Sequence, residues 1–229
     1  MTDLRIPVYT ASLEEAFTKE MEAFRREQSN AFRDRDTSLD VFDEKAFHIS
    51  MRRDGVLVGL VRANWGAPFL KSWARALDFW VPPAQMIEIS RLVCHRSARL
   101  RLASPHLIVC EALLYAASLQ AKWIVAAKDS TDRMLPFLFS LGATTLGSPF
   151  EGKVPPRAEV VSNQSIQLCL DNSLKRILCA YHYCISVSNR YGVRYESTIS
   201  HPHVERPSEQ EIARWKCERS VEQRNFRYS

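Results

Sequence analysis

The stretch MIEISRLVC, residues 86–94, decides the fold of this 229-residue chain, because it leads through a basic turn into a helix start. Its apolar and β-branched residues predict a buried strand. Ser104 and Pro105 then have the residue types typical of a helix N-cap and of the first helical position. The backbone amides of such a helix start bind phosphate groups. Because the turn contains no glycine, the pattern differs from a P-loop or a dinucleotide fingerprint.

The segment from residue 89 to residue 110 contains no acid and gathers positive charge. Its arginines are Arg91, Arg96, Arg99 and Arg101, and His95 and His106 lie among them. Such a cluster attracts a phosphorylated or acidic partner, and a solvated turn is the alternative. Nucleic acid is not the partner that we expect. The segment lacks interleaved aromatic residues, and the chain shows no helix-turn-helix or zinc pattern.

The part of the chain before this strand predicts one helix and one hairpin. Apolar residues at helical spacing predict an amphipathic helix over residues 13–28, followed by a charged loop over residues 29–44. Apolar and polar side chains alternate over residues 47–52, which predicts a half-buried strand. The turn signal at residues 53–55 then leads into a more deeply buried strand over residues 56–63. Residues 64–85 combine aromatic residues with prolines, and they either line a pocket or cap the core.

The part of the chain after Pro105 predicts alternating helices and strands. The buried face of the helix that starts at Ser104 comprises Leu107, Cys110, Leu114 and Ala117. The further elements are a strand over 123–127, a helix that Thr131 or Asp132 caps and that ends at Gly142, strands near 143–147 and 165–170, and a helix over 174–186. We therefore expect one α+β domain over residues 1–186, an α/β/α sandwich with a mixed central sheet. Residues 187–229 predict a polar tail with one peripheral helix, for which Ser208 to Glu211 form a capping box.

Composition limits the class of protein. The 46% apolar and 25% charged content is that of a globular chain, so we exclude disordered and fibrous classes. No apolar run has the length of a membrane span, and the charged opening is unlike a secretory leader. We therefore expect a cytoplasmic protein without a membrane partner. The six cysteines show neither a C-x-x-C pair nor zinc spacing, which predicts structural thiols and no metal site.

Three groups of motifs together resemble the LuxI-type acyl-homoserine lactone synthases, the autoinducer synthases. DVFD at residues 40–43, followed by GLVR at residues 59–62, resembles that family's D-x-[FY]-D segment and G-x-x-R strand. EISRL at residues 88–92 matches the family's E-x-S-R-[FL] strand without a gap. DRML at residues 132–135 and LGSP at residues 146–149 resemble its helix and L-G-x-P run.

This resemblance spans about residues 13–180 and implies a GNAT-like acyltransferase fold. In the family, the amine of S-adenosylmethionine (SAM) attacks the acyl thioester of an acyl carrier protein, or of acyl-CoA in some members. The homoserine lactone then closes and methylthioadenosine leaves. The resemblance therefore implies quorum-sensing signal production, with SAM as a co-substrate and no tightly bound cofactor.

The resemblance also implies roles for single residues. The catalytic positions are Glu88, Ser90 and Arg91, with Glu88 assisting deprotonation of the amine directly or through a water. The SAM-binding positions are Asp40, Phe42, Asp43 and Arg62, whose network Arg91 joins. The positions implied to hold the phosphopantetheine of the acyl donor are Arg96, Arg99 and Arg101. Carboxylates suit the ammonium and sulfonium of SAM, and an arginine suits its carboxylate.

Two features of the sequence bear on this assignment. In a regular strand Glu88 and Arg91, three residues apart, point to opposite faces. Both face one pocket only if the strand contains a β-bulge. The resemblance implies such a bulge, because GNAT-like folds are expected to carry one here, so we predict it near residues 88–92. The family's N-terminal helix supplies an arginine that an aromatic residue and a tryptophan follow. Arg25 and Arg26 lie in that region here, but no tryptophan precedes Trp65.

Three alternatives remain open at this point. Glu88 would have a purely structural role if it forms an ion pair with an arginine inside the core. An N-acyl amino acid synthase shares the scaffold and the donor but acylates an ordinary amino acid. A catalytically silent acyltransferase fold would instead bind a carrier protein or nucleic acid through the arginine cluster.

Overall fold

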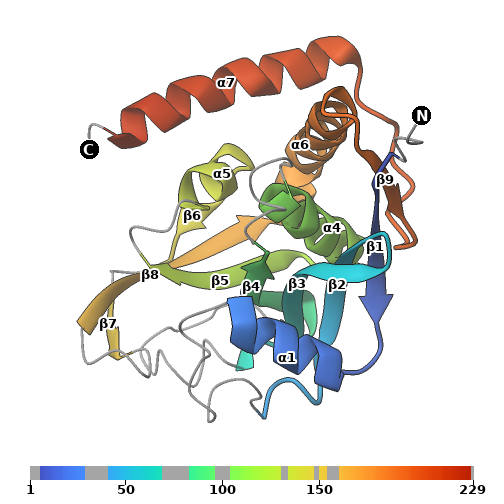
Figure 1. Cartoon of the computed structure of the whole chain (residues 1–229). Coiled ribbons are helices and arrows are strands. Elements are labelled where there is room, and N and C mark those ends of the chain that lie inside the picture. The colour runs from blue at the N-terminus through green and yellow to red at the C-terminus, as the bar shows by residue number, and fades with distance from the viewer. Residues whose placement is uncertain are drawn as a thin grey trace, which may run out of the picture.

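The computed structural model describes residues 6–28, 41–68, 83–95, 104–129, 134–146, 150–153 and 160–227. Within these residues one mixed sheet forms the centre of the molecule, and helices cover both of its faces (Figure 1). The strand order is β6-β8-β5-β4-β3-β2-β1-β9, and β7 pairs with β8. The α+β sandwich predicted from the sequence is confirmed.

The strands fall into an antiparallel half and a mixed half. The antiparallel half comprises β1 (Val8–Glu14), β2 (Phe47–Arg53), β3 (Val56–Trp65) and β4 (Met86–Cys94). The other half comprises β5 (Trp123–Asp129), which runs parallel to β4, together with β6 (Thr144–Thr145), β7 (Phe150–Lys153) and β8 (Val160–Cys169). The short β9 (Arg194–Ser197) pairs in parallel with β1 at the far edge.

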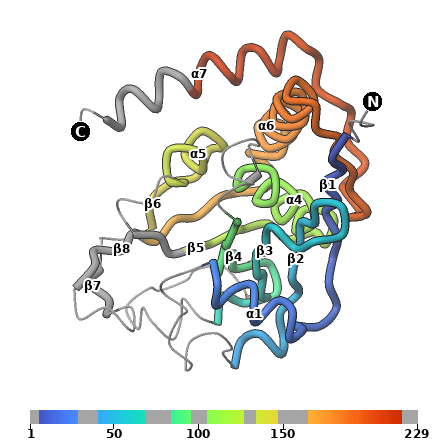
Figure 2. The backbone as a smooth tube through the Cα atoms, viewed as in Figure 1, coloured from blue at the N-terminus to red at the C-terminus, as the bar shows by residue number. Residues whose placement is uncertain are grey.

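The helices on the two faces differ in number. The helix α1 (Lys19–Gln28) covers one face, where its Met21 and Phe24 pack on Leu60. The neighbouring Gly59 faces the other way, since a side chain there would meet Ile108 of α4. The helices of that second face are α4 (Ser104–Ser118), α5 (Leu135–Ser140) and α6 (Leu170–Arg190). Outside them lies α7 (Glu209–Arg227), which crosses α5 and α6 (Figure 2).

The prediction for the N-terminal segment was wrong in two respects. The first strand β1 was not expected, and the first helix begins at Lys19 rather than at residue 13. Thr18 caps this helix, because its hydroxyl accepts a hydrogen bond from the amide of Met21 at 3.3 Å. Residue 13 belongs to the strand because β1 is held on both sides, by β2 and by β9, and this pairing overrides the local helical spacing.

The hairpin prediction is confirmed, with one difference in burial. Asp54 and Gly55 both have positive φ, 48° and 87°, as the two-residue turn between β2 and β3 requires. However, β2 is not half-buried. His48 and Ser50, on the face expected to be polar, are as buried as the apolar residues between them. The reason is that α1 and the chain before it cover this face of the sheet.

The elements after Pro105 agree with the predicted order but differ in extent. The helix α4 has no single buried face, because residues 107–114 are all buried. Gly142 ends α5 as predicted, with φ 101° and an amide that donates to the Phe139 carbonyl at 2.8 Å. Strand β7 was not predicted, and β8 and α6 are longer than predicted. The predicted caps Thr131 and Asp132 lie outside the described residues.

The C-terminal segment is more than the polar tail that we expected. The predicted peripheral helix is present as α7. The predicted capping box is also present, since the amide of Ser208 donates to the Glu211 carboxylate at 2.9 Å and the amide of Glu211 donates to the Ser208 hydroxyl at 3.3 Å. The segment before it supplies β9 to the central sheet, although its polar sequence gave no strand signal. No helix among the described residues is long and apolar enough to cross a membrane.

All six cysteines lie in the described residues and form no disulfide. Burial raises the pKa of the Cys184 thiol to about 12 and raises the pKa of Cys110 well above its ordinary value. Both thiols therefore stay protonated at neutral pH and fill space as small apolar groups. Among the described residues no three His, Cys, Asp or Glu side chains are grouped to hold a metal ion.

Candidate active site

The central strand β4 contains the predicted β-bulge. Leu60 and Arg62 of β3 pair with Val93 and Ser90 of β4, so two steps along β3 correspond to three along β4. The extra residue lies at Arg91 and Leu92, and Arg91 adopts φ 55°, which is uncommon for a residue with a side chain. Because directly paired residues share a face, the bulge keeps Ser90 and Val93 on the same side of the sheet.

The bulge places Glu88 and Ser90 on the face that α1 covers. Asn64 pairs with Glu88 as Arg62 pairs with Ser90, so these four side chains leave the sheet on one side. Glu88 is only 1% exposed. Arg91 has no directly paired residue on β3, so the strand pairing does not show which face its side chain is on. That Arg91 and Glu88 face one site therefore stays a prediction.

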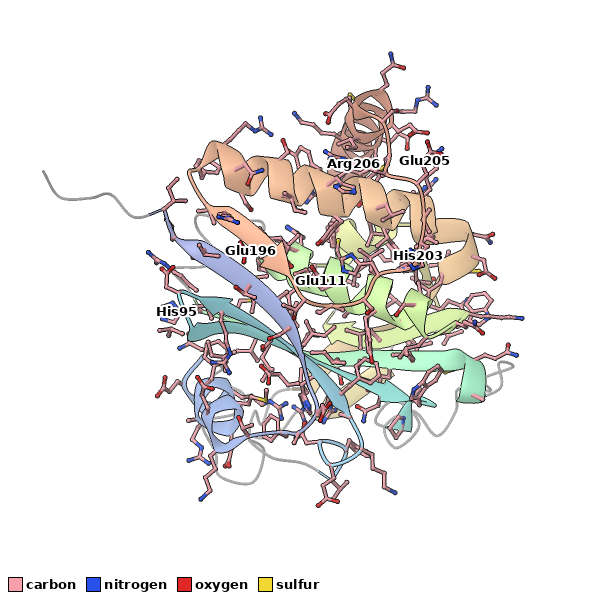
Figure 3. All side chains as sticks on the ribbon, turned by 90° about the vertical axis from the view of Figure 1, so that its right-hand side faces the viewer. His95, Glu111, Glu196, His203, Glu205 and Arg206 are labelled. Atoms are coloured by element: carbon pink, nitrogen blue, oxygen red, sulfur yellow. The ribbon has the colours of Figure 1, made fainter. Side chains whose placement is uncertain are left out.

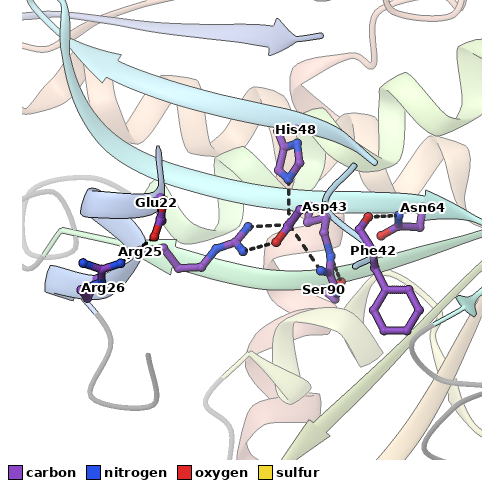
Figure 4. A network of polar contacts seen from close by, with 9 residues as sticks. Glu22, Arg25, Arg26, Phe42, Asp43, His48, Asn64 and Ser90 are labelled. Atoms are coloured by element: carbon purple, nitrogen blue, oxygen red, sulfur yellow. Dashed lines mark hydrogen bonds and ion pairs between the residues drawn. The ribbon is translucent and has the colours of Figure 1, made fainter. Parts of the chain in front are cut away.

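The carboxylate of Asp43 is the centre of a buried polar network on this face (Figure 4). Arg25 of α1 donates two hydrogen bonds to it, Nη1 to Oδ2 at 2.8 Å and Nη2 to Oδ1 at 3.0 Å. Arg62 of β3 contacts Oδ1 at 3.4 Å, and Nε2 of His48 of β2 lies 3.2 Å from the same oxygen. All four side chains are fully buried. A two-pronged arginine–carboxylate contact fixes orientation as well as charge.

Arg62 connects this network to the bulged strand. Its Nε donates to the hydroxyl of Ser90 at 3.1 Å. Its guanidinium also lies 5.8 Å from the ring of Phe42. The chain around Phe42 is held in turn by Asn64, whose amide donates to the Phe42 carbonyl at 2.8 Å. Asp43, Phe42, Arg62 and Ser90, which the sequence placed in one site, therefore meet in the structure.

The sequence analysis did not assign two members of this network, Arg25 and His48. Arg25 follows Met21 by four positions, so it lies on the apolar face of α1, and an arginine on such a face was the available signal. His48 gave none, because its position looked like the exposed side of a strand. In the structure the ring of Phe17 stacks against both, 4.3 Å from the Arg25 guanidinium carbon and 5.0 Å from the His48 ring.

An apolar pocket lies on the opposite face of the same strand. It has an empty volume of about 480 Å³, part of it open to solvent. Its walls come from β4, β5, β8, α4 and α5, and they include Ile89, Leu92, Ile124, Leu113, Met134 and Leu138. Ser90, the residue that accepts the Arg62 hydrogen bond, also lines it. The polar network and the apolar pocket thus lie on the two sides of β4 at Ser90, next to the bulge.

The two central parallel strands separate at the same place. The pairing between β4 and β5 comprises Met86 with Trp123, Ile87 with Ile124 and Glu88 with Val125, and it ends there. Both strands continue for several residues beyond Glu88. Among the described residues this is where the sheet opens, and the pocket lies between the separating strands and the helices.

The remaining predicted positions cannot be placed against this geometry. Asp40 of the proposed SAM site and the donor-binding Arg96, Arg99 and Arg101 lie outside the described residues. The helix start that was predicted to bind phosphate is present, because α4 begins at Ser104.

A second buried carboxylate, Glu111 of α4, lies on the side of the molecule where the chain leaves β9 (Figure 3). It accepts hydrogen bonds from the hydroxyl of Tyr195, from the hydroxyl of Ser197 at 3.1 Å and from the imidazole of His201, with Nε2 at 2.6 Å. Burial, and then the charge of Glu111, raises the pKa of Tyr195 well above its ordinary value, so the phenol remains a neutral donor. This network attaches the C-terminal segment to α4.

Comparison with known proteins first establishes the class of fold. No protein-family model matches the sequence, and no curated protein matches it. Among solved structures, this fold is that of the GNAT-type acetyltransferases. An N-acetyltransferase from Staphylococcus aureus Mu50 superposes with a TM-score of 0.51 at 12% identity, covering 70% of this chain and 98% of its own.

Within that class the structure resembles the LuxI-type acyl-homoserine lactone synthases, as the motifs predicted. BjaI, a CoA-dependent acyl-homoserine lactone synthase solved with SAM and isopentyl-CoA, superposes with a TM-score of 0.56 at 14% identity, over 92% of this chain and 99% of its own. FeeM, an N-acyl amino acid synthase from uncultured soil microbes, gives a TM-score of 0.57 at 14% identity, over 72% of this chain and 92% of its own. At these identities the similarity establishes the fold.

Proposed function

We propose that this protein is an acyl-homoserine lactone synthase, which transfers an acyl chain from a thioester donor to the amine of SAM. The observation that carries the proposal is the position of Ser90. This residue contacts the buried Arg62–Asp43 network and also lines an apolar pocket, so a polar amine site and an acyl site would adjoin at one strand. The similarity to BjaI, which was solved with SAM and isopentyl-CoA, supports the same assignment.

In the proposed reaction, Glu88 takes a proton from the SAM amine, directly or through a water. Its buried position beside the opening between β4 and β5 suits a base that acts where the two substrates meet. The amine nitrogen attacks the thioester carbonyl carbon, and the pantetheine thiolate leaves. The edge of β4 beyond Glu88, where the pairing with β5 has ended, would offer a backbone N–H to the developing oxyanion. The SAM carboxylate then attacks the carbon next to the sulfonium, which closes the lactone and releases methylthioadenosine.

The geometry refines the role proposed for Asp43. Its oxygens already contact Arg25, Arg62 and His48 in a fully buried setting. We therefore assign Asp43 to positioning Arg62, whose guanidinium would hold the SAM carboxylate, rather than to direct contact with the SAM ammonium. Phe42 and Ser90 would flank the same guanidinium.

The acyl donor would be bound at two places, one for its acyl chain and one for its phosphopantetheine. The pocket between the separating strands would hold the acyl chain, because its walls are almost entirely apolar side chains. The start of α4, together with Arg96, Arg99 and Arg101, would hold the phosphopantetheine of acyl-CoA or of an acyl carrier protein.

The test is product formation by the purified protein with SAM and a series of acyl-CoA and acyl carrier protein donors. Mass spectrometry should detect an acyl-homoserine lactone together with methylthioadenosine. The variant Glu88→Gln should lower kcat by about 100- to 10,000-fold, as loss of a general base does, with a small effect on KM. The exposed Glu15→Gln is the matched control and should behave like the parent protein. Undiminished turnover by Glu88→Gln would show that the base is assigned wrongly.

A second candidate function is N-acyl amino acid synthesis, which the similarity to FeeM favours. Formation of a linear N-acyl amino acid without methylthioadenosine would select it. If the protein binds an acyl carrier protein or nucleic acid but turns over no donor, the non-catalytic alternative is correct.

A further inference from the structure

The C-terminal helix α7 lies against the part of the structure that lines the apolar pocket. It packs on α5 and α6, outside the layer formed by α4, α5 and α6 (Figure 1). Its inward residues Ile212 and Trp215 are 8% and 3% exposed. Among the described side chains of α7 these two apolar residues are buried, and the helix is attached against α5 and α6.

The contact between α7 and α5 is specific. The indole Nε1–H of Trp215 donates to the carbonyl oxygen of Ser140, the last residue of α5, at 3.2 Å, and both atoms are buried. The last carbonyls of a helix lack partners within it, so this bond satisfies a group that would otherwise be costly to bury.

A second residue of α7 extends the same contact. The guanidinium carbon of Arg219 lies 5.3 Å from the ring centroid of Phe137 and 5.5 Å from that of Trp215. Phe137 is fully buried in α5 and contacts the ring of His106 of α4 on another side, with centroids 4.3 Å apart. The Trp215 and Arg219 side chains, four positions apart on one face of α7, thus both contact α5.

Other residues of α5 form a wall of the pocket. Met134, at its N-terminal end, and Leu138, four positions later, both line the pocket. The helix has only six residues, and Met134 provides no side-chain hydrogen bond as a cap. A helix this short has little stability of its own, so its position depends on what it packs against. Among the described elements, α7 makes the most extensive contact with α5.

We propose that α7 sets the depth of the apolar pocket, and hence the length of acyl chain that it accepts, with Trp215 and Arg219 as the positioning residues. The inference rests on the proposed function, in which the pocket holds the acyl chain. Weakening the contact lets α5 move outward with Met134 and Leu138, so the pocket lengthens. Trp215 and Arg219 contact α5, whereas Glu88 and Ser90 leave the sheet on the face that α1 covers.

The experiment compares chain-length preference among variants of the full chain. The first variant, Trp215→Phe, keeps an aromatic ring and removes the N–H, while Arg219→Gln removes the guanidinium over Phe137. Arg214→Gln is the matched control, because Arg214 is an exposed arginine of the same helix. Leu138→Ala, which enlarges the pocket directly, shows the direction of shift expected for a deeper pocket. Turnover of donors from butanoyl-CoA to tetradecanoyl-CoA is measured, together with displacement of the fluorescent fatty acid cis-parinaric acid by free fatty acids of the same lengths.

We expect Trp215→Phe and Arg219→Gln to shift the kcat/KM ratio of long over short donors by about threefold or more, in the direction of Leu138→Ala. Fatty-acid displacement should shift likewise, and Arg214→Gln should match the parent. An unchanged length preference in Trp215→Phe, in a parent that does show one, would overturn the inference and leave the proposed function intact. A parent that neither turns over a donor nor binds a fatty acid would instead overturn the proposed function. If Arg219→Gln does not fold, Trp215→Phe decides alone.

Discussion

Asp43 and Glu111 are both fully buried carboxylates, yet different donors surround them. Asp43 contacts two guanidiniums and one imidazole from α1, β2 and β3, whereas Glu111 contacts two hydroxyls and one imidazole from the C-terminal segment. The Asp43 network leads through Arg62 to Ser90 and the pocket. The Glu111 network leads to β9 and the chain that follows it.

The difference separates the network for which we propose a role in substrate binding from one that attaches the C-terminal segment. Arginines keep their charge at any pH at which the protein is folded, so the Asp43 group holds fixed charge next to Ser90, which also lines the apolar pocket. Hydroxyl donors compensate Glu111 mostly through dipoles, which is sufficient to hold a strand and a loop. Similar burial therefore does not imply a similar role.

The largest expected effect comes from breaking the charged network. Asp43→Asn leaves two buried guanidiniums without their carboxylate, and we expect a loss of about 3–5 kcal/mol in the free energy of unfolding, measured by urea titration. The matched control is Glu20→Gln, which removes an exposed carboxylate that Arg52 contacts at 2.7 and 2.9 Å. An exposed pair of this kind contributes below about 1 kcal/mol. Equal losses for the two variants would show that burial adds nothing to the Asp43 contacts.

His106 provides a contrast to the two buried carboxylates, because it is a largely buried group that stays uncharged at neutral pH. Burial, and then the nearby Arg219, lowers its pKa from 6.5 to about 4. Between those two pH values the unfolded chain binds a proton that the folded protein does not, so stability falls as the pH decreases. The loss should approach about 1.4 kcal/mol per pH unit and about 3 kcal/mol by pH 4.

The measurement for His106 is a series of urea titrations from pH 7 to pH 4 on the parent protein and on His106→Gln. Carboxylates also titrate in this range, so the difference between the two slopes isolates the histidine. Parallel slopes would contradict the lowered pKa.

The smallest expected effect concerns the Glu111 network. Glu111→Gln keeps an acceptor and loses the charge, and we expect a loss of about 1–3 kcal/mol in the free energy of unfolding. Hydrogen exchange should accelerate in residues 194–203 ahead of the rest of the sheet. Product formation should be unchanged. Asp43→Asn, by contrast, should lower product formation, because Asp43 is proposed to position Arg62. If Glu111→Gln lowered turnover as much as Asp43→Asn, the division between the two networks would be wrong.

The parts of the fold that the sequence predicted are those with a strong local signal. The hairpin from β2 to β3 has a turn sequence that only a few backbone conformations fit, and β4 is rich in apolar and β-branched residues. Strands β1 and β9 were missed because each is mixed in polarity and stabilised by a partner far away in the sequence. Their signal is the pairing itself, which no local pattern contains.

The residues of the candidate site likewise divide into those that the sequence predicted and those that it did not. The E-x-S-R motif located Glu88 and Ser90, and the spacing of Glu88 and Arg91 predicted the bulge that the structure contains. His48 was missed because whether a strand face is solvated depends on α1 and Phe17, which pack on it from elsewhere in the chain. Glu111 was likewise not singled out, because the groups that contact it follow more than eighty residues later.

The sequence by itself therefore determined the order of the main elements, the central strand with its acid, serine and arginine, and a resemblance to one class of acyltransferase. Only the tertiary structure decided that Asp43 is saturated by arginines, that Ser90 borders both a polar network and an apolar pocket, and that α7 contacts a pocket wall. The physical reason is the distance along the chain over which each interaction acts. Turns, caps and hydrophobic periodicity act between neighbours in the chain, whereas the burial of a charge and the shape of a pocket depend on segments that meet only after folding.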